Sequence, residues 1–400
     1  MRALVASLYD GPIFDNMASV IVPNDESLLP AVWAFCSSPE YNLEVRRINQ
    51  KVQVANRTFV KVPFDLDRWT KVAQEKYPHG LPKPYSDDPT QWVFHGHPCR
   101  SVVWSDQTKH LKEGPLRVDA TVLQVAVARL VGYRWPAEPD ADLELSEESR
   151  TIATSCGSLL PLADTDAIVC VPSVRGEPAA VDRLEQLLAA AYGKAWSADT
   201  LSQLLAQCDN AGGTLETWLR DKFFAQHCKL FQHRPFVWHI WDGLPDGFAA
   251  LVDYHRLDRK TMETLIYAYL GSWISRQRQD LASRIDGTSE RLEAALQLQE
   301  RLKLILEGEK PYDIFVRWKP LSQQPIGWDP DLNDGVRMNI RPFVTAHVLR
   351  FDKKPQLSVT WDKDRGKDVE AAPWFKVFRG ERINDHHTTL DEKRAARKEE

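Results

Sequence analysis

Basic and amide side chains alternate along residues 45–57, whose sequence is VRRINQKVQVANR. Arginine or lysine can pair with a DNA phosphate or with guanine, and asparagine or glutamine can form two hydrogen bonds with adenine. The segment therefore suits DNA contact, with cations on phosphates and amides on bases. The residues concerned, including one lysine just beyond the segment, are Arg46, Arg47, Asn49, Gln50, Lys51, Gln53, Asn56, Arg57 and Lys61. The pattern also fits a solvated helix end followed by a polar edge strand.

A second group of polar side chains lies nearer the C-terminus. Its cations suit phosphate contact, because neutralising a phosphate releases bound counterions. The group consists of Arg337, Asn339, Arg341, Lys363, Arg365 and Lys367. The neighbouring aspartates equally allow a set of surface ion pairs, so both interpretations stay open.

Two histidine-containing motifs lack the companions that catalysis or metal binding requires. His239 lies in an apolar segment near Asp242, without an identifiable nucleophile. We expect a hydrogen-bonded structural histidine there. Residues 95–99 (HGHPC) offer metal-ligating types, but a closed zinc site needs four ligands and no partner cluster is evident. We expect a turn with hydrogen-bonded histidines, and we predict no catalytic residue and no metal site.

A metal-dependent nuclease is a lesser alternative. Asp352, Lys353 and Lys354 have the Asp-x-Lys form that such nucleases use, with Asp331 and Asp334 upstream. Magnesium sites need several convergent carboxylates, which a sequence cannot place. The pattern is short and common by chance, and its charged middle residue is atypical.

Length and composition limit the class of protein. The chain has 400 residues, enough for two or three domains, and its 43% hydrophobic and 27% charged content is typical of globular proteins. Because the net charge is −5, a DNA-binding protein of this composition needs a local basic face. The six cysteines are scattered without a Cys-x-x-Cys pair, which favours reduced thiols. Since neither a signal peptide nor an apolar run of about 20 residues occurs, we expect a cytoplasmic protein without membrane contact.

Hydrophobic periodicity predicts the elements that would position these residues. Two short helices are expected within residues 28–48, and longer ones at 117–131, 180–192, 199–208, 214–231, 260–281 and 289–306. The last two form an antiparallel hairpin. Strands are expected at 2–9, 19–22, 58–62, 166–171, 234–241, 248–254, 347–351 and 356–361. Thr214 and Thr217 lack the Glu or Gln of a capping box, and the charged tail from Leu390 is expected to be a solvated helix or a frayed end.

Residues 311–343 combine tryptophans with prolines, which disfavour a continuous helix or a central strand. We expect an ordered loop clamped by aromatic side chains, called the clasp below. The fold class is α+β and multidomain. Its parts are a small mixed α/β lobe (1–68), a connector (69–115), a mixed α/β middle domain (116–255), a helical hairpin (256–310) and an aromatic-rich C-terminal lobe (311–400).

Long motifs in the chain resemble a known family. They are YDIFVRWKPLSQQPIGWDPDLNDGVRMNIRPF in the clasp, WDKDRGKD and RINDHHTTLDEKRAARK after it, and LLPAVWAFCSSPEYNLEVRRINQ and YSDDPTQWVFHGHP before it. The chain resembles the C-terminal, target-recognition part of large adenine-specific DNA methyltransferases. These belong to BREX-, DISARM- and type IIG-like phage-defence and restriction-modification systems. The resemblance implies that residues 1–68 are a recognition lobe and that the hairpin is a spacer.

The resemblance implies S-adenosyl-L-methionine (SAM) as methyl donor, but the chain contains neither Gly-x-Gly nor Pro-Pro. In the family, a glycine-rich turn holds the donor, and a Pro-Pro-aromatic motif clamps the flipped adenine. We therefore expect the catalytic domain and its SAM outside this chain, in a partner subunit or in a longer enzyme.

The function implied is DNA binding and target recognition for site-specific adenine-N6 methylation, which makes DNA contact at residues 45–57 the expectation. The implied partners are double-stranded DNA, the methyltransferase catalytic domain or subunit, and other defence-system proteins. A structural assembly subunit, which would use the hairpin and the clasp to hold proteins and would bind no DNA, is the alternative from a different class.

Overall fold

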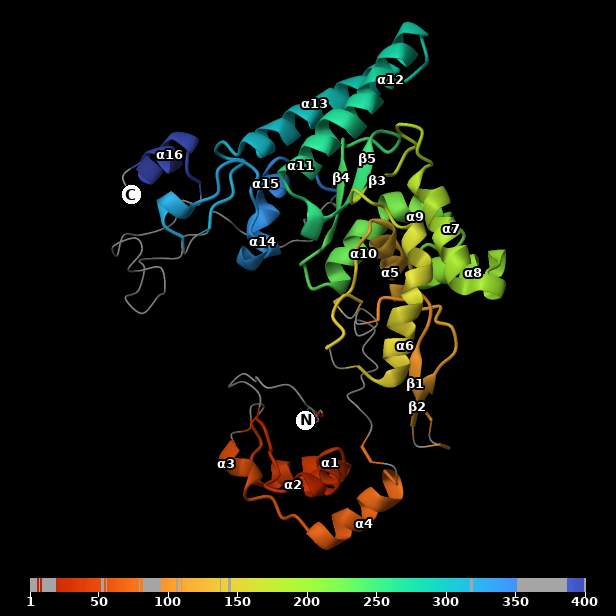
Figure 1. The fold of residues 1–400 in the computed structure, drawn as a ribbon, viewed down its shortest axis with the longest axis vertical. Helices are drawn as coiled ribbons and strands as arrows, with labels where there is room; N and C mark the ends of the chain where they lie inside the picture. The colour runs from red at the N-terminus through yellow and green to blue at the C-terminus, as the bar shows by residue number, and fades with distance from the viewer. Residues whose placement is uncertain are drawn as a thin grey trace. The chain divides into compact units, whose positions relative to one another are not determined.

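The computed structural model describes residues 19–51, 54, 56–78, 80–81, 95–105, 107–108, 110–136, 138–142, 145–316, 319–350 and 387–398, with residues 6 and 8 (Figure 1). The chain divides into two compact units. The first contains Met1–His95, Arg100–Leu116 and Pro136–Thr154, and the second contains Gly96–Cys99, Arg117–Trp135 and Ser155–Glu400. Both combine helices with small sheets, which confirms the α+β multidomain class. The finer division into five segments stays a prediction.

Four short helices form the N-terminal part of the first unit: α1 (Leu29–Cys36), α2 (Pro39–Ile48), α3 (Asn56–Phe59) and α4 (Leu66–Lys76). The hydroxyl of Ser38 accepts from the backbone N–H of Tyr41, and Pro39 occupies the first turn, so α2 begins at this point. Phe35 packs against Tyr41 and Trp69, with ring centroids 5.3 and 5.1 Å away. These three rings form the middle of a small aromatic core.

The strand expected at residues 58–62 is wrong, because α3 and a following turn occupy this position. The backbone N–H of Lys61 donates to the carbonyl of Thr58, and that of Val62 donates to Phe59. Val60 is consequently 84% exposed, whereas Thr58 is buried. Thr58, Val60 and Val62 are β-branched and therefore favoured a strand in the sequence analysis. The chain forms a local turn there instead. No strand forms at residues 19–22 either, and most of the strand expected at 2–9 lies outside the described residues.

The first unit also contains a β-hairpin that the sequence did not predict. Strands β1 (Val102–Ser105) and β2 (His110–Glu113) pair antiparallel, with Val103 opposite Lys112. Each strand has only four residues, and the turn between them lacks glycine, so neither pattern nor turn chemistry marked them. Helix α6 (Glu147–Ser155) follows later in the chain.

A three-stranded antiparallel sheet of order β3-β5-β4 is central to the second unit. Its strands are β3 (Ile168–Cys170), β4 (Val237–Trp241) and β5 (Ala249–Asp253). The surrounding helices are α5 (Thr121–Leu130), α7 (Ala180–Tyr192), α8 (Ala198–Gln207), α9 (Leu215–Asp221) and α10 (Phe223–Leu230). In Figure 1 the strands lie between these helices and a long helical hairpin. The strands expected in this region are confirmed, as are the helices, except that the single helix expected at 214–231 is divided at Lys222 into α9 and α10.

Helix α9 begins with a capping box that the sequence analysis excluded. The Thr214 hydroxyl accepts from the backbone N–H of Thr217 at 3.1 Å, and the Thr217 hydroxyl accepts from the backbone N–H of Thr214 at 3.0 Å. A threonine hydroxyl thus replaces the carboxylate or amide usual at this position.

The predicted helical hairpin is confirmed. Its first arm runs through α11 (Arg259–Glu263), a π-helical segment (Thr264–Tyr269) and α12 (Leu270–Ala282). Its second arm is α13 (Thr288–Glu307), which starts after Gly287 in a left-handed conformation with φ of 72°. Trp273, Ile274 and Leu298 are among the residues buried by the hairpin.

The clasp is an ordered loop fastened by aromatic rings, as predicted. Trp328 is buried, its indole N–H donates to the carbonyl of Leu257, and its ring lies 5.0 Å from that of Phe343. The clasp contains 3-10 turns at Leu321–Gln323 and Leu332–Asp334 and the short helix α14 (Val336–Asn339), and helix α15 (Arg341–Thr345) runs on from it. Leu349 forms a single bridge with Ile240 of β4, so only a trace of the strand expected at 347–351 forms. The strand expected at 356–361 lies outside the described residues.

Candidate nucleic-acid interface

The turn after helix α2 is folded around the side chain of Asn49. Its amide nitrogen donates to the Thr58 hydroxyl at 3.2 Å, and its amide oxygen accepts from the backbone N–H of Lys51 at 2.9 Å. The Arg46 guanidinium donates to the backbone carbonyl of Lys51. These bonds fix α3 against the end of α2, so the predicted contact segment has a defined conformation.

Four cations in and beside this turn are exposed, namely Arg47, Lys51, Arg57 and Lys61. Residues 45–64 contain five lysines and arginines and no aspartate or glutamate, whereas the chain as a whole carries −5. Arg47 also pairs with Glu44, the acidic residue just before this stretch. The segment is therefore locally basic, which is the property that DNA contact by a chain of negative net charge would require. Arg46 and Arg47 lie in the last turn of α2, where a cation interacts favourably with the helix dipole and stabilises the helix. This structural role is the alternative to DNA contact for these two arginines.

The predicted base-reading amides separate into two kinds. Gln50 and Asn56 are exposed and can reach a ligand. Asn49 uses both ends of its amide inside the turn. It positions the segment and does not read a base in this conformation. Gln53 lies outside the described residues.

The structure corrects the second predicted group. Arg337 on α14 is exposed, but Asn339 and Arg341 are 0% and 1% exposed. The Asn339 amide donates to the Tyr254 hydroxyl at 2.7 Å and to the Asp331 carbonyl at 2.8 Å. The Arg341 guanidinium lies against the ring of His387. Both side chains are therefore part of the protein interior. Their position in the sequence, close to cations expected at the surface, was a misleading signal.

Lys363, Arg365 and Lys367 lie outside the described residues. The two predicted groups fall in different compact units, since residues 46–61 belong to the first and residues 337–341 to the second. Each is therefore a separate prediction of DNA contact.

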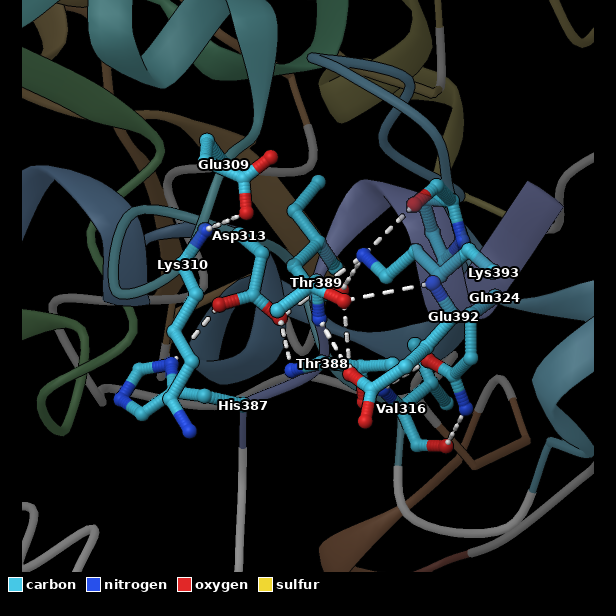
Figure 2. A network of polar contacts seen from close by, with 12 residues as sticks. Glu309, Lys310, Asp313, Val316, Gln324, His387, Thr388, Thr389, Glu392 and Lys393 are labelled. Atoms are coloured by element: carbon cyan, nitrogen blue, oxygen red, sulfur yellow. Dashed lines mark hydrogen bonds and ion pairs between the residues drawn. The ribbon is translucent and has the colours of Figure 1, made fainter. Parts of the chain in front are cut away.

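A buried polar network joins the clasp to the C-terminal helix α16 (Leu390–Lys398) (Figure 2). The Asp313 carboxylate lies 2.7 Å from Nδ1 of His387 and accepts from the backbone N–H of Thr388 at 3.1 Å. The Lys393 ammonium lies 3.7 Å from Oδ2 of Asp313, the same oxygen that accepts from Thr388. It also donates to the carbonyls of Ile314 and Pro325. The tail is a helix as expected, but it is not simply solvated, because Lys393 is 0% exposed.

The charges of this network stabilise each other. Burial alone would raise the pKa of Asp313, but the hydrogen bond with His387 and the charge of Lys393 hold it below its ordinary value. Burial lowers the pKa of Lys393, and Asp313 opposes that shift. The arrangement is that of a structural ion pair with satisfied hydrogen bonds.

The carboxylates considered for a nuclease are engaged with a lysine. The Lys319 ammonium lies 3.0 Å from Asp331 and 2.6 Å from Asp334. Asp352 lies outside the described residues. In the part of the chain that the structure describes, no group of three or more His, Cys, Asp or Glu residues is placed to hold a metal ion. Within that same part, no helix has the length and apolar character needed to cross a membrane.

The environment of His239 differs from the expectation, whereas His97 accepts a hydrogen bond from the backbone N–H of Cys99 at 3.3 Å, as expected for residues 95–99. His239 is buried, and its Nδ1 has no hydrogen-bond partner among the described residues. Burial lowers its pKa to about 3, so it is a neutral core residue. A hydrogen-bonded core histidine that the sequence analysis did not single out is His227 on α10. Its Nε2 accepts from the backbone N–H groups of Phe236 and Val237, so its Nδ1–H donates to Gln124. The signal that the sequence offered for His227 was its position on the apolar face of an expected helix.

Comparison with known proteins gives one partial similarity. No protein-family model matches the chain. An alignment of 134 residues, 28% identical, joins it to "Adenine-specific methyltransferase PglX" of Lacticaseibacillus casei (strain Zhang). The alignment covers 33% of this chain and 11% of that relative, so the chain spans only a small part of the relative's length. The similarity agrees with the resemblance to adenine-specific methyltransferases for about a third of the chain.

Proposed function

We propose that this chain is a DNA-binding, target-recognition portion of a SAM-dependent adenine-N6 DNA methyltransferase of a phage-defence or restriction-modification system. The observation that carries the proposal is the acid-free stretch at residues 45–64, with four exposed cations in and beside a turn fixed by Asn49. The partial similarity to an adenine-specific methyltransferase supports the choice of system.

In this function, Arg47, Lys51, Arg57 and Lys61 hold the phosphates of duplex DNA. Such contacts fix position without reading sequence. Gln50 and Asn56 are the remaining candidates for adenine recognition in the described part of the chain. Their amides can reach the base edges only after the cations have oriented the turn on the duplex.

Methyl transfer is assigned to another domain or subunit. The described strand-to-helix connection from β3 to α7 (residues 171–179) contains a single glycine, Gly176, together with Glu177. It does not provide the Gly-x-Gly turn expected around SAM, so no step of the transfer is derived from these residues.

The proposal is tested by measuring binding of the full chain to a pool of random duplex DNA. Replacing Arg57→Ala together with Lys61→Ala removes two exposed cations and is expected to weaken binding to all sequences about tenfold or more. The matched control is Lys222→Ala with Lys229→Ala, which removes the same charge from exposed positions in the second unit. Equal binding by the two double variants would reject the assignment.

An assembly role is a second candidate, favoured by exposed apolar side chains in the same lobe. Leu43, Ile48 and Val60 are 59%, 43% and 84% exposed. Such residues can mark a protein contact. If the chain binds no DNA at any salt concentration, alone or with a methyltransferase subunit, this second function replaces the first.

A further inference from the structure

A tyrosine of the helical hairpin contacts the loop between β3 and α7 (residues 171–179). The Tyr269 hydroxyl lies 2.9 Å from the Asp166 carboxylate and 3.0 Å from the Glu177 carboxylate. Asp166 lies just before β3, and Glu177 belongs to the loop. We call these three residues the tyrosine joint.

Counting hydrogens shows that the joint needs an additional proton. A tyrosine hydroxyl donates one hydrogen, and an ionised carboxylate can only accept. With both carboxylates ionised, one of the two contacts would place two oxygen lone pairs against each other. Both contacts are hydrogen bonds only when Asp166 or Glu177 is protonated, so that the carboxylic acid donates to the tyrosine oxygen.

The surrounding charges favour Asp166 as the residue that carries the proton. Arg183 of α7 lies 2.9 Å from Asp164 and 3.7 Å from Glu177, so its charge stabilises these two carboxylates. Asp164 also lies beside Asp166, whose backbone N–H donates to it at 2.9 Å. Burial, followed by the contact with Asp164, raises the pKa of Asp166 to about 6.

Three arginines and a cysteine also lie around the joint. The Arg175 guanidinium of the loop stacks on the Tyr269 ring at 5.0 Å, and Arg276 of α12 donates to the Ser173 carbonyl. Arg256 donates to the backbone carbonyl of Thr165. Cys170 is buried, and burial raises the pKa of its thiol, so it stays neutral.

The backbone around the joint is held in uncommon conformations. Tyr269 is the last residue of the π-helical segment Thr264–Tyr269. Ala167 and Arg175 have φ values of 70° and 57°, in the left-handed region that favours glycine. Such conformations persist where surrounding contacts maintain them. Loss of a contact at the joint would therefore let the loop relax.

We propose that Asp166, Glu177 and Tyr269 share one proton and form a joint that acid tightens, fastening the β3–α7 loop to the hairpin. When the pH rises, the proton leaves to solvent, and repulsion between the ionised carboxylates and the tyrosine oxygen replaces one hydrogen bond. The loop then opens more often. This device is independent of the DNA-binding proposal, because it lies in the second unit and its test involves no DNA.

Hydrogen exchange of the full chain at pH 5 and pH 8, corrected for intrinsic exchange rates, tests the joint. The opening constant of residues 171–179 should rise at least about tenfold between the two pH values, because a raised carboxyl pKa links opening to loss of a proton. A change of less than about twofold would overturn the proposal, since one pKa unit corresponds to tenfold in the equilibrium.

Two variants and a control separate the joint from a general pH effect. Glu177→Gln supplies an amide donor to the Tyr269 oxygen, so the loop should stay protected at both pH values. Tyr269→Phe removes the shared hydroxyl, so the loop should open at both. Glu185→Gln on the exposed side of α7 should keep the normal pH dependence. If Glu177→Gln and Tyr269→Phe both retain the wild-type pH dependence, the proton is not shared at this joint.

Discussion

Asp313 and Lys393 form an ion pair in which both side chains are completely buried, with 3.7 Å between carboxylate and ammonium. The pair connects the start of the clasp to the C-terminal helix α16. Each partner also has hydrogen bonds to other groups, which offset part of the cost of burying charge. The position of the tail thus depends on a residue in a distant part of the chain.

Removing one member of this pair should release the tail. Lys393→Met leaves the Asp313 carboxylate buried without its cation, so local stability should fall by about 3–5 kcal/mol. The change is measured as the free energy of opening of α16 by hydrogen exchange. Arg394→Ala, at an exposed position of the same helix, is the control and should change stability by less than about 0.5 kcal/mol. Similar effects of the two variants would contradict the role of the pair.

Acid should destabilise the second unit through its buried histidines. Burial lowers the pKa of His227 to about 3, far below the ordinary value of 6.5. The stability that this neutral ring contributes is fully present above pH 6.5 and is lost as the pH falls toward 3. The expected loss is about 1.4 kcal/mol per pH unit in that window.

The measurement is the pH dependence of urea unfolding for wild type and His227→Phe. The variant should be less stable at pH 7, because the two backbone N–H groups lose their acceptor, but its stability should depend less on pH. His239, with a similarly lowered pKa, contributes to the slope that remains. An unchanged slope in the variant would show that His227 does not titrate in this way. The tyrosine joint acts with the opposite sign, because the raised pKa of Asp166 favours the folded state below pH 6.

The close approach of two glycines should be sensitive to a single methyl group. A Cβ placed on Gly308 would lie 2.6 Å from the Cα of Gly327, and φ at Gly308 is 72°. Gly308→Ala should therefore destabilise the clasp by about 1 kcal/mol for its backbone conformation and more for the clash. Gly212 has the same φ, and no atom of the described residues lies within 4 Å of the position that its Cβ would take, so Gly212→Ala isolates the backbone term. Thermal unfolding compares the two, and equal losses would contradict the contact.

Asn49 should affect DNA binding without carrying charge. Asn49→Ala removes the bonds to Thr58 and Lys51, so the turn loses about 1–2 kcal/mol of local stability and binding should weaken. The salt dependence of binding should stay near wild type, because every cation remains. Thr58→Val, which removes the hydroxyl partner, should weaken binding in the same direction. Wild-type affinity in both variants would show that the turn needs no fixed conformation.

Elements with clear periodicity were predictable from the sequence. The helix at 180–192, the hairpin and the two strands β4 and β5 each combine a regular apolar pattern with flanking turn residues. The ordered clasp followed from tryptophans too apolar for a free linker. The missed hairpin β1–β2 is too short for a pattern to be distinctive, and the end of α3 and the turn after it carry Thr58, Val60 and Val62, β-branched residues typical of a strand.

The candidate site was only partly predictable, for a related reason. The exposed cations at 47–61 follow from composition, because a stretch without acidic residues is visible in the sequence. The burial of Asn339 and Arg341 depends on Tyr254 and His387, which lie far away along the chain. Tertiary partners of this kind decide whether a polar residue faces solvent, and a single sequence does not reveal them.

The salt dependence of duplex DNA binding tests the central claim most directly. With four phosphate contacts, affinity should fall roughly a hundredfold between about 50 and 200 mM salt. Replacing Arg57→Ala and Lys61→Ala should reduce the slope of log affinity against log salt by about 2. A slope near zero, or an equal slope in this variant and in wild type, would contradict a DNA interface at residues 45–64.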